Sequence, residues 1–244
     1  MNWFRKIFPP KNWSILNASV QGPSHIKNQI PNQDFSIVDY IDGCLLAMVC
    51  DGLGSHKYSH IGAKNLCHVF VENFKRWHRQ TQPRMKDFLQ VLQKKWICSS
   101  VKNYGVSNCG CTCQLAILNK KGQGWLAQLG DGITLTYHNN KTQAFTEEKR
   151  GSANETTALG ELSIMQYWRL HKIDISKSGD CLFIMTDGIS EDILDNKHNQ
   201  FVQNFEPIFL LPKFRAQKKL IEDLTHWPTP HHLDDKTIVA IQRR

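Results

Sequence analysis

Seven consecutive apolar residues, Cys44–Cys50, constrain the fold of this 244-residue chain more than any other segment. A strand that alternates apolar and polar residues has one face in water, whereas a strand that is apolar throughout is buried on both faces. The run stops at Asp51-Gly52, a dipeptide typical of turns. We therefore expect a strand inside a sheet that is covered on both sides, with an aspartate at its exit.

Further segments of both kinds follow without an internal repeat. Apolar residues recur with helical spacing over about residues 61–77 and 85–104, which predicts two amphipathic helices that cover a sheet. Turns near residues 119–122 and 130–132 separate three β-type segments, as in a meander. A helix-like stretch is expected from near Ser190. The predicted strands besides Cys44–Cys50 are 13–20, 111–118, 124–129, 133–137, 181–185 and 237–242.

Length and composition fit one large domain or at most two small ones. Hydrophobic residues make up 41% of the chain, which is too rich for a disordered protein. No apolar run reaches the roughly 18 to 20 residues that span a bilayer, and the start of the chain does not resemble a signal peptide. The 8 cysteines are scattered through apolar segments, which favours a reducing compartment over a disulfide framework. We expect a cytoplasmic protein without a transmembrane segment.

The formal net charge of +8 suggests an anionic partner. Nucleic acid, acidic phospholipid and phosphorylated protein would each satisfy this charge, and a lysine-rich surface with no such partner is the other reading. The opening residues mix aromatic and basic side chains and then break at Pro9 and Pro10. We expect a loose N-terminal arm at residues 1–12, with contact to a membrane surface as the alternative.

Aspartates stand at the ends of several predicted strands, beside glycine or another aspartate. A single Asp-Gly pair indicates a turn and no more. Four such positions on backbone held by buried strands indicate a cation site, because Mg²⁺ and Mn²⁺ prefer carboxylate, carbonyl and water oxygens. Two such ions about 3.5 to 4 Å apart can polarise a phosphoryl group and supply a hydroxide nucleophile near neutral pH. The positions are Asp51-Gly52, Gly130-Asp131-Gly132, Asp187-Gly188 and Asp234-Asp235.

Six short motifs follow one another over nearly the whole chain: PNQD at 31–34, VCDGLG at 49–54, GCT at 110–112, LGDG at 129–132, MTDG at 185–188 and DDKT at 234–237. In this order they resemble the motifs of phosphatase 2C-type metal-dependent protein serine/threonine phosphatases. The last motif and the segment Gly22-Pro23-Ser24-His25 resemble the bacterial-type branch. The resemblance implies an α+β fold, a four-layer α-β-β-α sandwich of two packed antiparallel sheets flanked by helices, in a single domain over residues 13–244.

The resemblance also implies two divalent cations, Mn²⁺ or Mg²⁺. Asp51 would bridge both ions, and Gly52 would offer its carbonyl oxygen. Asp187 and Asp234 would complete the ligands of one ion, although the sequence leaves open whether Asp234 or Asp235 is the ligand.

Three further acidic residues receive roles from the same resemblance. Asp34 matches an aspartate close to the metal-bound waters. Asp131 and Glu191 match positions that hold a weaker third cation. The expected catalytic residues are therefore Asp34, Asp51, Asp187 and Asp234.

The first motif departs from the family pattern. Gln29 replaces the arginine that grips phosphate, and Gln33 replaces the acidic residue. A glutamine can donate hydrogen bonds to phosphate but supplies no charge. His25 and Lys27 are therefore expected to contact the substrate phosphate together with Gln29. Leu53 stands where some members carry a histidine proposed to protonate the leaving group, so that proton must come from a metal-bound water or another residue.

Other patterns allow two interpretations each. Cysteines alternate over residues 109–113 and could form a thiolate cluster, but their spacing is shorter than zinc sites use and favours buried, hydrophobic cysteines. His231 and His232 could join a metal site or lie in a polar loop. Residues 151–157 resemble the mobile flap of the family, or form an ordinary polar loop.

We expect hydrolysis of phosphoserine or phosphothreonine in proteins by direct attack of a metal-activated water, without a phosphoenzyme. The alternative is a pseudophosphatase that binds phosphorylated partners, which Gln29 and Gln33 favour and the retained aspartates oppose. The sequence lacks the motifs of P-loop nucleotide hydrolases and serine hydrolases. Nucleic-acid binding rests on charge alone and is not expected. The expected partner is a phosphorylated protein, and the sequence does not fix the oligomeric state.

Overall fold

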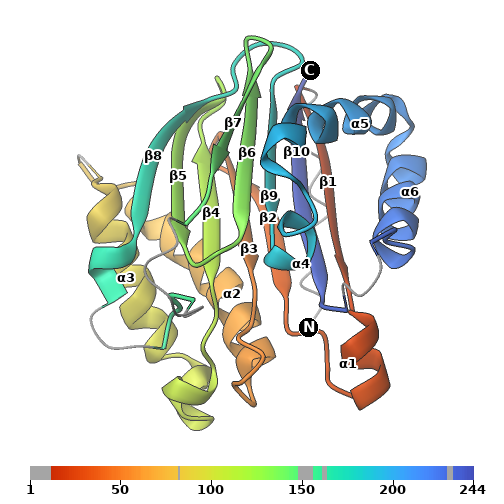
Figure 1. The fold of residues 1–244 in the computed structure, drawn as a ribbon. Helices are drawn as coiled ribbons and strands as arrows, with labels where there is room; N and C mark the ends of the chain where they lie inside the picture. The colour runs from red at the N-terminus through yellow and green to blue at the C-terminus, as the bar shows by residue number, and fades with distance from the viewer. Residues whose placement is uncertain (1–11, 82, 148–155, 161–163, 230–232) are drawn as a thin grey trace.

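Two five-stranded antiparallel sheets form the centre of the protein in the computed structural model, which describes residues 12–81, 83–147, 156–160, 164–229 and 233–244 (Figure 1). The first sheet has the strand order β1-β10-β9-β6-β7, and the second has the order β2-β3-β4-β5-β8. The strands of the first sheet are β1 (Trp13–Val20), β10 (Lys236–Arg243), β9 (Cys181–Met185), β6 (Ile133–His138) and β7 (Lys141–Phe145); those of the second are β2 (Phe35–Ile41), β3 (Cys44–Cys50), β4 (Cys113–Leu118), β5 (Gln123–Leu129) and β8 (Arg169–Asp174).

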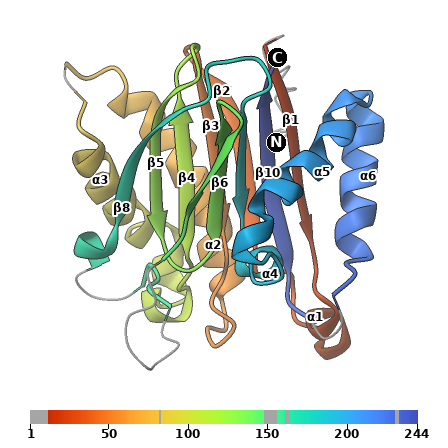
Figure 2. The ribbon, with the colours of Figure 1, turned by 45° about the horizontal axis from the view of Figure 1, so that its top comes forward.

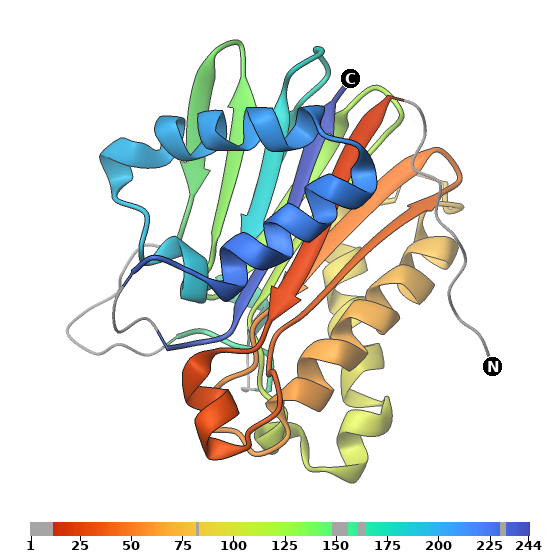
Figure 3. The same cartoon turned by 90° about the vertical axis from the view of Figure 1, so that its right-hand side faces the viewer.

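Helices cover the outer face of each sheet, which gives the four layers that the motifs imply (Figures 1 and 2). Helices α5 and α6 lie on the first sheet, and α2 and α3 lie on the second (Figure 3). Two short helices, α1 and α4, lie at one end of the sandwich. The bounds are α1 (Pro23–Asn28), α2 (Ser59–Trp77), α3 (Met85–Ile97), α4 (Asp187–Ser190), α5 (His198–Leu210) and α6 (Lys213–Thr225).

Strand β3 is buried on both faces, as its apolar run predicts. Leu45 and Val49 belong to the hydrophobic cluster between the two sheets, together with Val239 of β10. Met48, on the opposite face, belongs to the cluster beneath α2 and α3, together with Phe70. Because side chains alternate along a strand, only a sheet with neighbours on both sides buries every residue of such a run.

Helix α5 is attached to the first sheet by aromatic packing. The ring centroid of Phe205 lies 4.9 Å from that of Phe183 on β9, and Phe209, one turn later, packs on the same ring. Leu220 of α6 completes this cluster. The phenylalanines stand four residues apart, which places them on one face of the helix.

The predicted helix at residues 85–104 was too long. Helix α3 ends at Ile97, where the Ser99 side chain accepts a hydrogen bond from the Val101 N–H and begins a 3-10 segment, Ser100–Asn103. Such a bond offers the backbone an alternative to continued α-helix. A second 3-10 segment, Val106–Asn108, follows.

Two other boundaries also differ from the predictions. The strand expected from residue 111 begins at Cys113, because Cys111 forms only isolated bridges, to Gly52 and Leu159. The helix expected near Ser190 is the single turn α4, and the longer helix α5 starts at His198. Strands β2, β7 and β8 were not predicted.

The predicted N-terminal arm lies outside the described residues except for residue 12, so the division of the chain at that point stays a prediction. Within the described part of the chain, no helix is both long enough and apolar enough to cross a membrane.

Candidate metal centre

Acidic side chains from distant parts of the chain meet at one end of the sandwich. Asp51 follows the end of β3, and Asp187 follows the end of β9. Asp131 lies in the connection from β5 to β6, and Asp234 lies just before the start of β10. The antiparallel pairing of these strands places all four positions at the end near α1 and α4 (Figure 1).

The backbone at Asp51 is fixed by the segment that precedes β4. The Asp51 N–H donates to Thr112 Oγ1 at 3.1 Å, and the Asp51 carbonyl accepts from the Thr112 N–H at 2.7 Å. Gly52 forms an antiparallel bridge with Cys111. A Cβ atom at Gly52 would lie 2.7 Å from the Gln33 carbonyl oxygen, so a larger residue would push this loop away. The GCT motif therefore holds Asp51 in place.

Carboxylate oxygens of Asp51, Asp131 and Asp187 all lie within 4.8 Å of one another, a spacing that could hold a metal ion. Among the residues that the structure describes, Asp131 Oδ1 is buried without a hydrogen-bond partner, while its Oδ2 accepts from the Thr156 hydroxyl. A buried carboxylate oxygen without a donor is costly unless a cation or water satisfies it. Oxygen donors of this kind suit hard divalent cations. The residues present therefore fit the metal site that the sequence predicts.

Burial, and then the neighbouring carboxylates, raise the pKa values of Asp51 and Asp187. Burial raises the pKa of Asp51 well above its usual range, and the charges of Asp34, Asp187 and Asp234 add to the effect. Burial likewise raises the pKa of Asp187 to about 6, with Asp131 and Asp234 contributing. Charged groups held this close favour protonation unless a positive charge is present.

Asp34 enters the cluster from the loop before β2. Burial, followed by the charge of Asp235, raises the pKa of Asp34 to about 8. The Thr186 hydroxyl donates to Asp34 Oδ2 at 2.9 Å and accepts from the Thr237 N–H at 3.1 Å. Thr186 therefore ties Asp34 to β9 and β10, and fixes its position beside Asp51.

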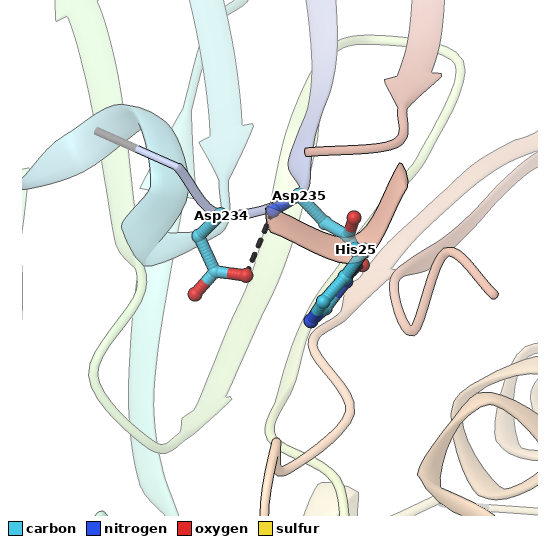
Figure 4. A group of neighbouring side chains, drawn as sticks. All are labelled: His25, Asp234 and Asp235. Atoms are coloured by element: carbon cyan, nitrogen blue, oxygen red, sulfur yellow. Dashed lines mark hydrogen bonds and ion pairs between the residues drawn. The ribbon is translucent and has the colours of Figure 1, made fainter. Parts of the chain in front are cut away.

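The adjacent residues Asp234 and Asp235 have different environments (Figure 4). Asp235 is 2% exposed; its Oδ1 accepts from the Gly22 N–H at 2.7 Å and its Oδ2 from the Gln33 N–H at 2.6 Å. His25 Nδ1 lies 2.8 Å from the same Oδ2. Asp234 is exposed, and within the described part of the chain its side chain accepts one hydrogen bond, from the Asp235 N–H. Its charge contributes to the raised pKa values of Asp51 and Asp187. The open carboxylate of the pair is therefore that of Asp234.

Comparison with known proteins identifies the family. A model of the family described as protein phosphatase 2C matches residues 21–226, which is most of the chain. The chain belongs to the protein phosphatase 2C family. The predicted family is confirmed, and so is the predicted fold.

Individual relatives are more distant. A putative protein phosphatase from Mycoplasma pneumoniae is 25% identical over 144 residues, which cover 54% of this chain, and the chain spans about half (54%) of that relative's length. A serine/threonine phosphatase from S. agalactiae matches with a TM-score of 0.68 and 15% identity, over 95% of this chain and 100% of the other. The catalytic domain of the phosphatase PstP, solved with 2 manganese ions, matches with a TM-score of 0.65 and 16% identity, over 95% and 98%. At these identities the structures show a common fold.

The residues predicted to contact phosphate in this phosphatase 2C chain lie on α1 and differ in position. A ring nitrogen of His25, a carboxylate oxygen of Asp234 and a carboxylate oxygen of Asp235 all lie within 4.8 Å of one another. Lys27 and Gln29 are exposed, and among the described residues neither forms an ion pair or side-chain hydrogen bond with the acidic cluster. Gln29 ends α1 in the left-handed conformation, with φ of 57°. The structure therefore brings only His25 close to the carboxylates.

Glu191, predicted for a weaker third cation, caps the C-terminus of α4 and is exposed. Its charge contributes to the raised pKa of Asp187. It therefore faces the same acidic region from the rim.

Two cationic residues at this end were not predicted. Lys236 is 3% exposed, and its Nζ donates to the Asp234 carbonyl at 2.8 Å. Arg169 Nη2 donates to the Gly130 carbonyl at 2.7 Å and so holds the turn that carries Asp131. Lys236 could have been noticed in the sequence, because a lysine is unusual at the start of an otherwise apolar strand. The role of Arg169 could not, because its contact joins residues 39 apart and no local pattern indicates it.

The remaining patterns do not join the cluster. Cys109, Cys111 and Cys113 are fully buried among hydrophobic residues, and burial raises the pKa of the Cys109 and Cys113 thiols. His231 and His232 lie outside the described residues, as do residues 151–155 of the predicted flap. Thr156, also in that segment, binds Asp131 as described above.

Proposed function

We propose that this phosphatase 2C-family protein hydrolyses phosphoserine or phosphothreonine in proteins, in a reaction that depends on divalent cations. The observation that carries the proposal is the convergence of Asp51, Asp131 and Asp187 within 4.8 Å, with one buried oxygen of Asp131 that has no hydrogen-bond partner in the described part of the chain. A protein that only bound phosphorylated partners would gain nothing from carboxylates that repel one another and the phosphate.

The same side chains would hold two cations, Mn²⁺ or Mg²⁺. Asp51 would bridge them with the Gly52 carbonyl beside it, while Asp187 and Asp234 would complete the ligand set of one. Asp234 is preferred over Asp235, because both oxygens of Asp235 already accept backbone N–H groups. Asp131 would hold a weaker third cation together with Glu191.

When bound, such cations polarise a phosphoryl group and lower the pKa of water, so that water attacks phosphorus directly. The chain's own contribution is to position the groups around that water. Asp34, fixed by the Thr186 hydroxyl, lies beside Asp51 and would accept a proton from the attacking water. In the metal-free protein burial raises the pKa of Asp34 to about 8, so Asp34 would have to lose its proton, as nearby cations favour, before it accepts one from water.

The substrate phosphate would be contacted from α1. His25 is the candidate that lies near the cluster, because its Nδ1 lies 2.8 Å from Asp235 Oδ2. Lys27 and Gln29 would approach only a substrate that extends over the exposed side of α1. A neutral Gln29 in place of arginine implies that recognition depends more on the protein around the phosphate than on the phosphate alone.

We also propose that the protein works in the cytoplasm, where thiols stay reduced. All 8 cysteines are free in the structure, and five of them lie in the core beneath α2 and α3. The proposed partner is a phosphorylated protein.

The decisive experiment measures hydrolysis of para-nitrophenyl phosphate and of a phosphothreonine peptide, with Mn²⁺ and with a chelator. We expect turnover of both substrates with Mn²⁺ and none with the chelator. Peptide binding without turnover in the presence of Mn²⁺ or Mg²⁺ would contradict the proposal and establish a pseudophosphatase instead.

A further inference from the structure

An exposed apolar corner lies where α5 meets α6, at the end of the sandwich opposite the acidic cluster. Leu210, the last residue of α5, is 81% exposed, and Phe214, in the first turn of α6, is 80% exposed. Pro212 lies between them and is also exposed. Two large apolar side chains this exposed protrude into solvent and do not line a recess. Their contact with water is unfavourable in free energy.

Basic residues surround this corner. Residues 207–221 contain Lys213, Arg215, Lys218 and Lys219 and no acidic residue. Lys218 and Lys219 form ion pairs with Glu222 and Asp223 one turn further along α6. Lys213 and Arg215, next to Phe214, have no carboxylate partner among the residues that the structure describes. The corner therefore presents two cations beside its apolar side chains.

The chain enters the fold at the same end. Gln217 of α6 bonds to Asn17 of β1 through its side chain, at 2.7 Å, and the two elements run in the same direction (Figure 3). Trp13 starts β1 and Lys213 starts α6, and each lies about one turn or half a strand before that contact, so both elements start at the same end of the molecule. The first 11 residues, MNWFRKIFPPK, are also aromatic and basic without an acidic residue.

We propose that this corner, Leu210 to Arg215, binds the surface of a bilayer that contains anionic phospholipid. Leu210 and Phe214 would enter the interface between headgroups and acyl chains, while Lys213 and Arg215 would contact phosphate groups. An acidic protein would satisfy the charges, but a stable protein interface buries about 800 Å² on each partner with a well-packed centre, which two protruding side chains do not provide. Shallow insertion needs only such a tip and nearby cations.

Binding through the corner would also set the direction in which the acidic cluster faces, whatever reaction that cluster performs. The acidic cluster lies at the opposite end of the strands, so a molecule held at the corner would direct that cluster into the aqueous phase. Phosphorylated proteins could reach it without entering the membrane surface.

The test uses the full chain and sedimentation with vesicles of phosphatidylcholine, alone or with roughly one-third phosphatidylglycerol. We expect binding to the anionic vesicles only, and weaker binding as salt rises. The double variant K213Q/R215Q should bind at least about tenfold more weakly, since each cation near an anionic surface contributes about fivefold. L210S/F214S should lose a comparable factor, because serine has no apolar surface to insert.

Matched variants on α3 control for general effects of charge and hydrophobicity. Lys86 and Lys94 are exposed, as are Val91 and Ile97 at 41% and 37%, and α3 lies on the other sheet. K86Q/K94Q and V91S/I97S should bind vesicles as the parent does, and all four variants should keep the parent's thermal unfolding midpoint. The proposal is overturned if the corner variants bind anionic vesicles as tightly as the parent, even if the whole chain adheres through its first residues. It is equally overturned if the parent does not bind.

Discussion

Asp234 and Asp235 are adjacent, yet the structure predicts opposite consequences when each is replaced by alanine. Asp235 is buried and accepts two backbone N–H groups, from Gly22 and Gln33. Hydrogen bonds to a charged group contribute about 1.5 to 3 kcal/mol each, so Asp235→Ala should lower the free energy of unfolding by about 3 to 6 kcal/mol. Asp235→Asn keeps one accepting oxygen and should cost about half as much.

Asp234→Ala should behave differently. Its side chain is exposed and accepts one backbone N–H, so the unfolding free energy of the metal-free protein should change by less than about 1 kcal/mol. Loss of a negative charge beside Asp51 and Asp187 could even stabilise the metal-free fold, because it relieves repulsion. The affinity for Mn²⁺ and the turnover should fall sharply.

The assays are urea unfolding of the metal-free variants, followed by Mn²⁺ calorimetry and hydrolysis of para-nitrophenyl phosphate. Urea unfolding isolates the structural role, because no cation is present to compensate. If Asp234→Ala is strongly destabilised while Asp235→Ala keeps its stability and no longer binds Mn²⁺, then the two roles are reversed, and Asp235 is the carboxylate available to a cation (Figure 4).

Three further predictions address the cluster and α1. Asp51→Asn should abolish turnover and weaken Mn²⁺ binding while the circular dichroism spectrum stays unchanged; near-normal activity would refute a bridging role. The raised pKa values of Asp34 and Asp187, about 8 and about 6, mean that the metal-free fold holds protons that the unfolded chain releases near 3.8. Stability of the metal-free protein should therefore fall as pH rises from about 4 to 8, whereas Mn²⁺ should bind more tightly over that range and release protons, measurable by calorimetry in buffers of different ionisation enthalpy. A metal-free stability that rises over this window would contradict the carboxylate environment described here. Gln29→Arg should lower the Michaelis constant for a phosphothreonine peptide by roughly tenfold and leave that for small phosphate esters unchanged, because Gln29 lies in solvent and would meet only a substrate that extends over α1. His25→Ala should raise both constants; if the arginine variant changes neither the peptide's Michaelis constant nor its rate, Gln29 does not contact the substrate.

Much of the sandwich could be predicted because its signals are local. The apolar run of β3 and the turn after it both lie within nine residues, Cys44–Gly52, and need no knowledge of partners. Helix α3 was overextended for the same reason: residues 85–104 contain no glycine or proline that would mark an end, and the side-chain bond of Ser99 that ends the helix is not visible in the helical spacing. Helix α5 contains Pro207, which counts against a helix in any reading from the sequence, and aromatic packing on Phe183 compensates.

The candidate site was predictable in its residue types but not in its division of roles. That Asp51, Asp131 and Asp187 come together was expected from the family resemblance, and their carboxylate oxygens lie within 4.8 Å of one another in the structure. The buried role of Asp235 depends on Gly22, 213 residues away, and no local pattern reports such a contact. The same limit applies to His25, which the sequence grouped with two neighbours that the fold leaves in solvent.

Lys236 supplies one positive charge at the acidic end of the protein. A buried ammonium group is costly unless it is paired, and Lys236 meets this cost by donating to the Asp234 carbonyl amid several carboxylates. The pKa of Asp34 nevertheless rises to about 8 and that of Asp51 rises well above its usual range, first because both carboxyl groups are buried and then because neighbouring carboxylates disfavour a further negative charge. Ionisation of both groups therefore needs more positive charge than one lysine supplies, and divalent cations held at Asp51 would provide it.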